Sequence, residues 1–285
     1  MTQTVRDLET AVEALTNFRK YSTSPHHERF IFPLLCGTYF GYRKIDVLRI
    51  TAIAKALSEK PKYCDVGCGS GDFLSKIREF IPDAIGIENW ADLVYRCHKI
   101  KPDYIKIRDA RWGITERFDV IFVGWMEPGI DLRDAVAEKA DVVVTTLDQG
   151  ISLAAEFDGQ GYCKVASWRT PSWEDVNIEV LNRFYSQMPK NIFNNLSELR
   201  GAHNLWYVYS KRQSLEKVRE SLLESQELEQ DWSSERYDFE DVLDCCGFSY
   251  LSEIETIRSK FQERERLWEI RFINNLGTGV KKSPH

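Results

Sequence analysis

Two apolar runs set the strongest constraint on how this 285-residue chain can fold. Residues 119–123 read Asp-Val-Ile-Phe-Val, and residues 141–145 read Asp-Val-Val-Val-Thr. Continuous β-branched runs of this kind suit strands covered on both faces, as in a parallel sheet between helices. Short apolar runs alternate with helical stretches, and the candidate strands begin near Tyr63, Ala84, Tyr104, Asp119, Asp141, Tyr162 and Leu205. The sequence therefore predicts an α/β fold with a doubly wound, seven-stranded, mostly parallel sheet.

Helical segments are expected on both sides of this region. We divide the chain into a helical lid or extension over residues 1–60, a core domain over 61–211 and a second helical extension over 212–285. Residues 169–200 fit either a helix or a strand, because their apolar positions alternate in part. The run from Leu205 alternates with aromatic residues, so it is expected at or near a sheet edge. Apolar residues recur at helical spacing in both extensions, at Val5, Leu8, Val12, Leu15 and Phe18 and at Ile254, Ile257, Phe261, Trp268 and Phe272.

The segment from Lys62 to Leu74 is predicted to form a strand, a tight glycine turn and a helix. Glycines permit positive φ and let a ligand touch the backbone, while the helix behind them directs free N–H groups at the turn. The dinucleotide fingerprint G-x-G-x-x-G would require glycine at position 72, where this chain has Asp72. Asp65, two residues before the first glycine, would repel a pyrophosphate and favour a ligand that carries an ammonium group.

This pattern, D-x-G-x-G-x-G, resembles motif I of the class I (Rossmann-like) S-adenosylmethionine-dependent methyltransferases over about residues 60–210. The resemblance implies S-adenosyl-L-methionine as cofactor. Glu88 ends the second strand and would accept hydrogen bonds from the ribose hydroxyls, as in NAD enzymes. Asp109 would meet the adenine amine with help from the backbone of Ala110; the alternatives are a surface strand end for Glu88 and a helix N-cap for Asp109. The predicted cofactor-binding residues are Asp65, Gly67, Cys68, Gly69, Gly71, Glu88, Asn89, Asp109, Ala110 and Gly124.

The acceptor side of the site is predicted from two further segments. In the family, the residues after the fourth strand, 124–129 here, face the methyl group and the acceptor. This chain lacks the Asn/Asp-Pro-Pro-Tyr/Phe motif of enzymes that methylate nucleobase amino groups, which argues against adenine or cytosine as acceptor. Glu127 is the candidate catalytic residue that holds or deprotonates the acceptor. Tyr39 and Tyr42 lie in a glycine-bracketed turn and are candidates for a closing lid, with ordinary helix packing as the alternative.

Composition limits the class of partner. A net charge of −6 and a pI of about 5.6 lack the basic footprint of many nucleic-acid binders, so a small-molecule or protein methyl acceptor is favoured over RNA or DNA. Seven scattered cysteines without paired spacing predict reduced thiols, no metal site and a cytoplasmic protein. No secretory signal or membrane span is expected.

Several functions stay open at this point. They are an RNA methyltransferase, a non-catalytic S-adenosylmethionine-binding protein and an NAD-dependent oxidoreductase, the last disfavoured by Asp65 and Asp72. A homo-oligomer is also left open.

Overall fold

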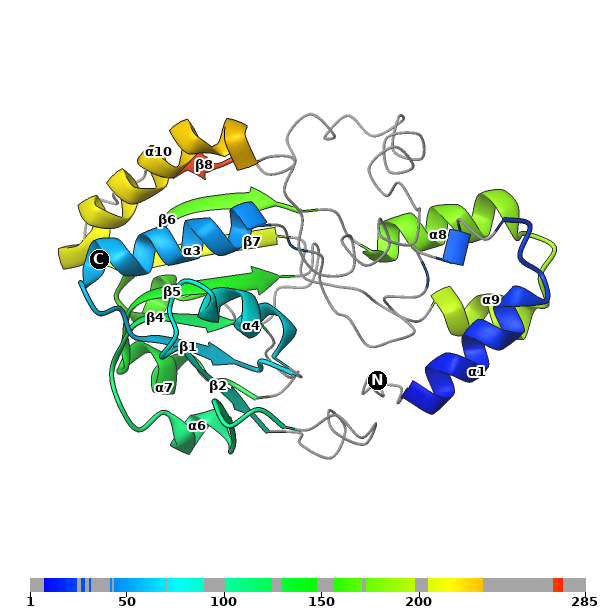
Figure 1. The fold of residues 1–285 in the computed structure, drawn as a ribbon, viewed down its shortest axis with the longest axis horizontal. Helices are drawn as coiled ribbons and strands as arrows, with labels where there is room; N and C mark the ends of the chain where they lie inside the picture. The colour runs from blue at the N-terminus through cyan, green and yellow to red at the C-terminus, as the bar shows by residue number, and fades with distance from the viewer. Residues whose placement is uncertain are drawn as a thin grey trace, which may run out of the picture.

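One sheet of eight strands organises the computed structural model, in the order β3-β2-β1-β4-β5-β7-β6-β8 (Figure 1). The strands from β1 to β5 pair in parallel, whereas β7 runs antiparallel between β5 and β6. The strands are β1 (Tyr63–Val66), β2 (Ile85–Glu88), β3 (Ile105–Ile107), β4 (Phe118–Val123), β5 (Ala140–Leu147), β6 (Tyr162–Arg169), β7 (Leu205–Lys211) and β8 (Arg271–Phe272).

The structure describes residues 8–24, 27–28, 31, 42, 44–69, 71–89, 101–124, 130–147, 156–170, 173–197, 205–232 and 269–273. Within these ranges, no helix is both long enough and apolar enough to cross a membrane. The helices are α1 (Leu8–Arg19), α3 (Lys44–Leu57), α4 (Asp72–Arg78), α6 (Ala110–Gly113), α7 (Arg133–Ala137), α8 (Trp173–Phe184), α9 (Lys190–Ser197) and α10 (Leu215–Trp232), with 3₁₀ turns η2 (Asp158–Gln160) and η3 (Arg212–Ser214).

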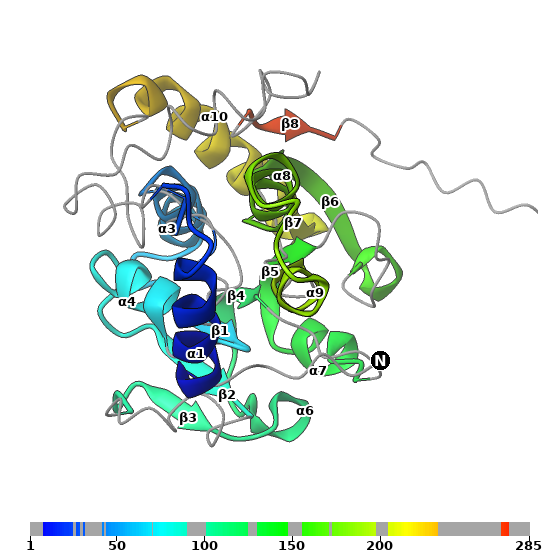
Figure 2. The ribbon, with the colours of Figure 1, turned by 90° about the vertical axis from the view of Figure 1, so that its right-hand side faces the viewer.

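Apolar side chains point alternately to the two faces of the sheet along each strand, and they form a core on each face. On β4, Val120 and Phe122 pack with residues of α3, α4 and α10, whereas Ile121 and Val123 pack with residues of α6 and α7. The two helical layers lie on opposite sides of the sheet (Figures 1 and 2). This is the doubly wound α/β fold that the continuous apolar runs predict.

The helices α1, α8 and α9 form a group beyond the carboxyl ends of the strands, and we call this group the cap (Figures 1 and 2). Two segments that are distant in sequence meet there, because α1 contacts α9. Parallel strands place their carboxyl ends at one edge of a sheet, and doubly wound folds bind ligands outside that edge. The cap therefore lies over the edge where a ligand is expected.

The strand positions agree closely with the sequence prediction, and three details differ. The sheet has eight strands and not seven, because β8 pairs with β6. Phe272 was predicted to lie on a helix and lies in β8. The strand from Leu205 was expected at or near an edge, yet β7 is flanked on both sides. Of the ambiguous residues 169–200, Arg169 ends β6, whereas residues 173–184 and 190–197 form α8 and α9.

The predicted division at residues 60 and 211 remains a prediction. The structure places α3, from the first segment, and α10, from the last, side by side on one face of the sheet.

Candidate functional site

The turn between β1 and α4 is built from glycines in the left-handed region of φ. Gly67, Gly69 and Gly71 have φ angles of 74°, 55° and 84°, which other residues rarely adopt. A Cβ atom on Gly71 would lie 2.6 Å from Cδ1 of Ile105. The backbone N–H of Gly67 donates to the carbonyl of Ile87 at 2.9 Å, which ties the turn to β2. The local sequence therefore permits a close backbone surface that side chains would block.

Glu88 joins the end of β2 to this turn. Its Oε2 accepts the backbone N–H of Gly69 at 2.8 Å, and its Oε1 accepts the backbone N–H of Asn89 at the same distance. The side chain is buried, with 7% exposed. A carboxylate offers about four acceptor positions, so these two bonds are compatible with further donors such as a pair of hydroxyls. The structure brings Glu88 to the turn, and its ribose role remains a prediction.

Asp65 lies on β1, two residues before the first glycine of the turn, and is 2% exposed. Its Oδ1 has no hydrogen-bond partner among the residues that the structure describes. Burial, and secondarily the nearby carboxylate of Glu88, raise the pKa of Asp65 well above its usual range. A buried polar atom without a partner is costly in a native protein, so this oxygen is a place where a ligand donor fits.

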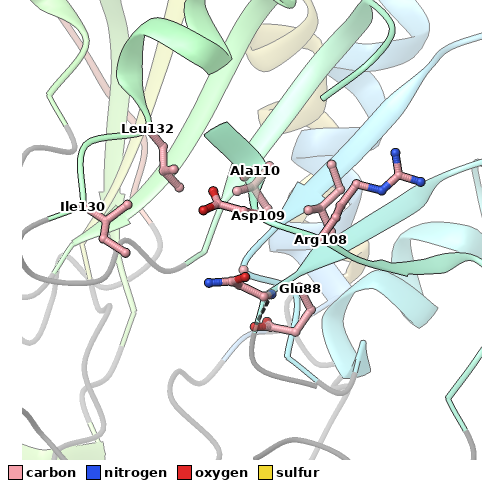
Figure 3. Close-up of a pocket in the computed structure, with 10 residues that line it drawn as sticks. Glu88, Arg108, Asp109, Ala110, Ile130 and Leu132 are labelled. Atoms are coloured by element: carbon pink, nitrogen blue, oxygen red, sulfur yellow. Dashed lines mark hydrogen bonds between the residues drawn. The ribbon is translucent and has the colours of Figure 1, made fainter. Parts of the chain in front are cut away.

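A pocket opens on the side of the sheet that α6 and α7 cover. It brings together five residues of the predicted cofactor set: Gly67, Glu88, Asn89, Asp109 and Ala110. Figure 3 shows the apolar side chains of Ile130 and Leu132 on the far side of Asp109 from Arg108. Both apolar residues were missed by sequence reasoning. The remaining lining residues are Val66, Ile87 and Arg108.

Asp109 has a structural role at this pocket. It is the N-cap of α6, where its Oδ1 accepts the backbone N–H of Arg111 at 2.9 Å. The Arg111 guanidinium also pairs with its Oδ2 at 2.6 Å, and the hydrogen bonds from Arg111 lower the pKa of Asp109. The N-cap alternative is thus observed. The carboxylate still lines the pocket, so contact with an adenine amine remains a prediction.

The other predicted residues lie at different depths. Gly124 directly follows β4, and its carbonyl accepts a hydrogen bond from the hydroxyl of Thr146 at 3.1 Å. Burial raises the pKa of the Cys68 thiol in the glycine turn. Tyr42 is 5% exposed and packs edge-to-face on Phe73 of α4, with ring centroids 4.8 Å apart, which matches the packing alternative. Tyr39 and Glu127 lie outside the described residues.

The cap is held together by the hydroxyl of Tyr185, which follows α8. That oxygen accepts the backbone N–H of Thr23 at 2.9 Å and lies 2.8 Å from Nδ1 of His27, a buried side chain. The ring of Tyr185 also packs edge-to-face on Phe18 of α1, with centroids 4.8 Å apart. These contacts join α1 and the segment after it to the end of α8.

Asn177 is a second feature of the cap that the sequence did not reveal. This side chain on α8 is 2% exposed, and neither of its amide atoms has a partner in the described part of the chain. It lies one helical turn before Val180 and Leu181, which are buried. The amide NH₂ of such a side chain can donate a hydrogen bond to a ligand, and its carbonyl oxygen can accept one.

Comparison with known proteins gives distant likenesses. A SAM-dependent methyltransferase from Archaeoglobus fulgidus is 15% identical over 60% of this chain and 95% of its own, with a TM-score of 0.39. The plantazolicin methyltransferase BpumL, solved in complex with SAH, is 13% identical over 72% of this chain and 96% of its own, with a TM-score of 0.37. No family model and no curated protein matches the chain.

The structure of Streptomyces venezuelae DesVI is also similar, at 19% identity over 36% of this chain, with a TM-score of 0.30. The chain spans 50% of the length of that protein. Function is therefore argued from the site itself. No group of side chains in the described ranges has the composition of a metal site.

Proposed function

We propose that this protein is an S-adenosylmethionine-dependent methyltransferase that acts on a small-molecule or protein acceptor. The observation that carries the proposal is the turn of left-handed glycines, which has buried Asp65 behind it and is bonded through Gly69 to Glu88. Backbone that a ligand can approach, an acid for hydroxyls and an acid for an ammonium group suit an adenosine that carries an amino-acid arm.

The described residues divide the recognition of that cofactor among them. Glu88 would accept hydrogen bonds from the ribose hydroxyls, and Asp65 would pair with the ammonium group. Asn89, Asp109 and Ala110 would line the adenine subsite, with Ile130 and Leu132 as its apolar wall. When bound, S-adenosylmethionine supplies a methyl group that its sulfonium has already activated.

The work left to the protein is to align an acceptor and exclude water. We propose that the cap contributes to the acceptor site, because it lies over the carboxyl edge of the sheet. Asn177 is the first cap residue to test, because both of its buried amide atoms lack partners in the described part of the chain. The proposal also includes Glu127 as the group that deprotonates the acceptor and Tyr39 as a lid residue. Tyr42 is not included as a lid residue, because it is packed on Phe73.

Electrostatics separates this function from NAD-dependent chemistry. Asp65 directly precedes the same turn at which a dinucleotide fold would place the pyrophosphate, and an anion there would disfavour ionisation of this buried acid, whereas an ammonium group would favour it. The acid at the end of β2 would serve a ribose in either case. The discriminating group is therefore Asp65 and not Glu88.

Calorimetry with S-adenosylmethionine, S-adenosylhomocysteine and NAD tests the cofactor assignment. We expect saturable binding of the first two and none of NAD; the opposite pattern would refute the proposal. Transfer of a radiolabelled methyl group to separate pools of metabolites, proteins and RNA then tests turnover. Label in the metabolite or protein pool supports the proposed acceptor class, and label in RNA alone would replace it. Binding without transfer to any pool would point to a non-catalytic binding protein.

A further inference from the structure

Among the residues that the structure describes, the groups that affect the charge of Asp65 are acidic, and none is a cation. The titratable groups that influence it or that it influences are Tyr63 and Cys64 on β1, Cys68 in the glycine turn and Glu88 on β2. No basic side chain in the described ranges contributes to the electrostatics of Asp65. An ionised Asp65 would be a buried charge without a described cation and near the carboxylate of Glu88, which costs free energy.

The donors of the turn do not relieve this cost. The backbone N–H groups of Gly69 and Asn89 point to the carboxylate of Glu88, and that of Gly67 points to the carbonyl of Ile87. Oδ1 of Asp65 receives none of them. Glu88 and Asp65 therefore differ in hydrogen bonding although both are buried.

We propose that Asp65 is a neutral carboxylic acid in the free protein and loses its proton when a ligand ammonium group binds beside it. The inference rests on the proposed function and adds a proton linkage to it. The O–H bond of the Asp65 carboxyl breaks, the proton passes to the solvent buffer, and the carboxylate pairs with the ammonium group of the S-adenosylmethionine amino-acid arm. The direction follows from charge, because an adjacent cation favours the ionised form of an acid.

Titration calorimetry measures this proton directly. Binding enthalpies are recorded at about pH 6.5, where free α-amino groups are protonated, in two buffers that differ in ionisation enthalpy. The dependence on buffer gives the number of protons exchanged. We expect S-adenosylmethionine and S-adenosylhomocysteine to release up to one proton per site. The matched ligand is 5′-methylthioadenosine, which has the same nucleoside without the ammonium group and is expected to release none.

The outcomes separate the two proposals. Failure of every nucleoside to bind would overturn the proposed function and this inference with it. Binding of S-adenosylmethionine without proton release would leave the function and overturn the inference. Equal release with 5′-methylthioadenosine would show that the ammonium group is not the cause and would also overturn it.

The substitution Asp65→Asn tests the source of the proton. Asparagine has the shape of the neutral acid, so the variant is expected to fold, to bind S-adenosylmethionine roughly 10- to 100-fold more weakly and to release no proton. Asp83→Asn is the control, since Asp83 is exposed between α4 and β2 and should retain both affinity and proton release.

Discussion

Asp65 and Glu88 lie on the adjacent strands β1 and β2, and we assign their carboxylates different roles because their hydrogen bonds differ. Glu88 accepts N–H groups from Gly69 and from its own neighbour Asn89, which fixes its position against the glycine turn. Asp65 is more deeply buried, and its Oδ1 has no partner in the described part of the chain. An acid that is already held by backbone donors suits neutral hydroxyls, whereas an acid without donors suits a cation.

Glu88→Gln should weaken binding of S-adenosylmethionine by about 1–3 kcal/mol, because a neutral amide replaces charge-assisted acceptors. The measurement is the dissociation constant from calorimetry. Glu79→Gln is the matched control: Glu79 is exposed, pairs with Lys76 on the outer side of α4 and should leave affinity unchanged. Equal losses in the two variants would contradict a direct role for Glu88.

Gly71→Ala should lower the free energy of unfolding by about 1–3 kcal/mol, because alanine is strained at positive φ. The residue has φ of +84°, and the new Cβ would meet Ile105 at 2.6 Å. Urea denaturation measures the change. Gly159→Ala in η2 is the control, since no atom lies within 4 Å of its Cβ position and its φ is not positive. Identical midpoints for the two variants would argue against strain in the turn.

At the scale of elements, the sequence predicted strands well where the signal was local. Continuous runs such as residues 119–123 can be buried on both faces only as inner strands, and they form β4 and β5 as expected. The register of β7 between β5 and β6 depends on pairing across the sheet, which alternation within residues 205–211 does not encode. The position of β8 in the sheet depends on its pairing with β6 and on Ile270, which is buried in the core on the α10 face.

Tyr185→Phe should loosen the cap without affecting the glycine turn. Removing the hydroxyl deletes the acceptor of the Thr23 N–H and the contact with His27, at a cost of about 1–3 kcal/mol. Amide hydrogen exchange should become faster in α1 and stay unchanged in α4. Tyr21→Phe serves as control because Tyr21 is 39% exposed. Faster exchange in α4 as well would show that the change is global and not confined to the cap.

At the scale of the whole molecule, the site combines segments of different predictability. Gly67, Glu88, Asn89, Asp109 and Ala110 were identified because motif spacing places them after successive strands, and the parallel sheet gathers those strand ends at one edge. The N-terminal segment that contains α1 was predicted as a helical lid, and that role remains a prediction. The apolar wall and the part of the cap formed by α8 and α9 were not identified. Their residues carry no local pattern of their own and meet the site only through the packing of separate segments, as the joining of α1 to α8 by Tyr185 illustrates.

The stability of the free protein should fall as the pH rises above the usual pKa of Asp65, which is 3.8. Burial, and then Glu88, raise the pKa of this carboxyl in the folded state. Between 3.8 and that raised pKa, the folded protein keeps a proton that the unfolded chain has lost. Since the unfolded state then binds fewer protons, the free energy of unfolding decreases with pH, by up to about 1.4 kcal/mol per pH unit.

Urea denaturation of the wild type and of Asp65→Asn over a series of pH values isolates this contribution, because the other titratable groups are common to both proteins. Their difference in unfolding free energy should change steadily through the window in favour of Asp65→Asn and become constant above the folded pKa. Parallel curves over the whole range would mean that Asp65 titrates alike in the folded and unfolded states. Burial without a cation would then not control its charge, and the electrostatic basis for selecting a cationic cofactor would be lost.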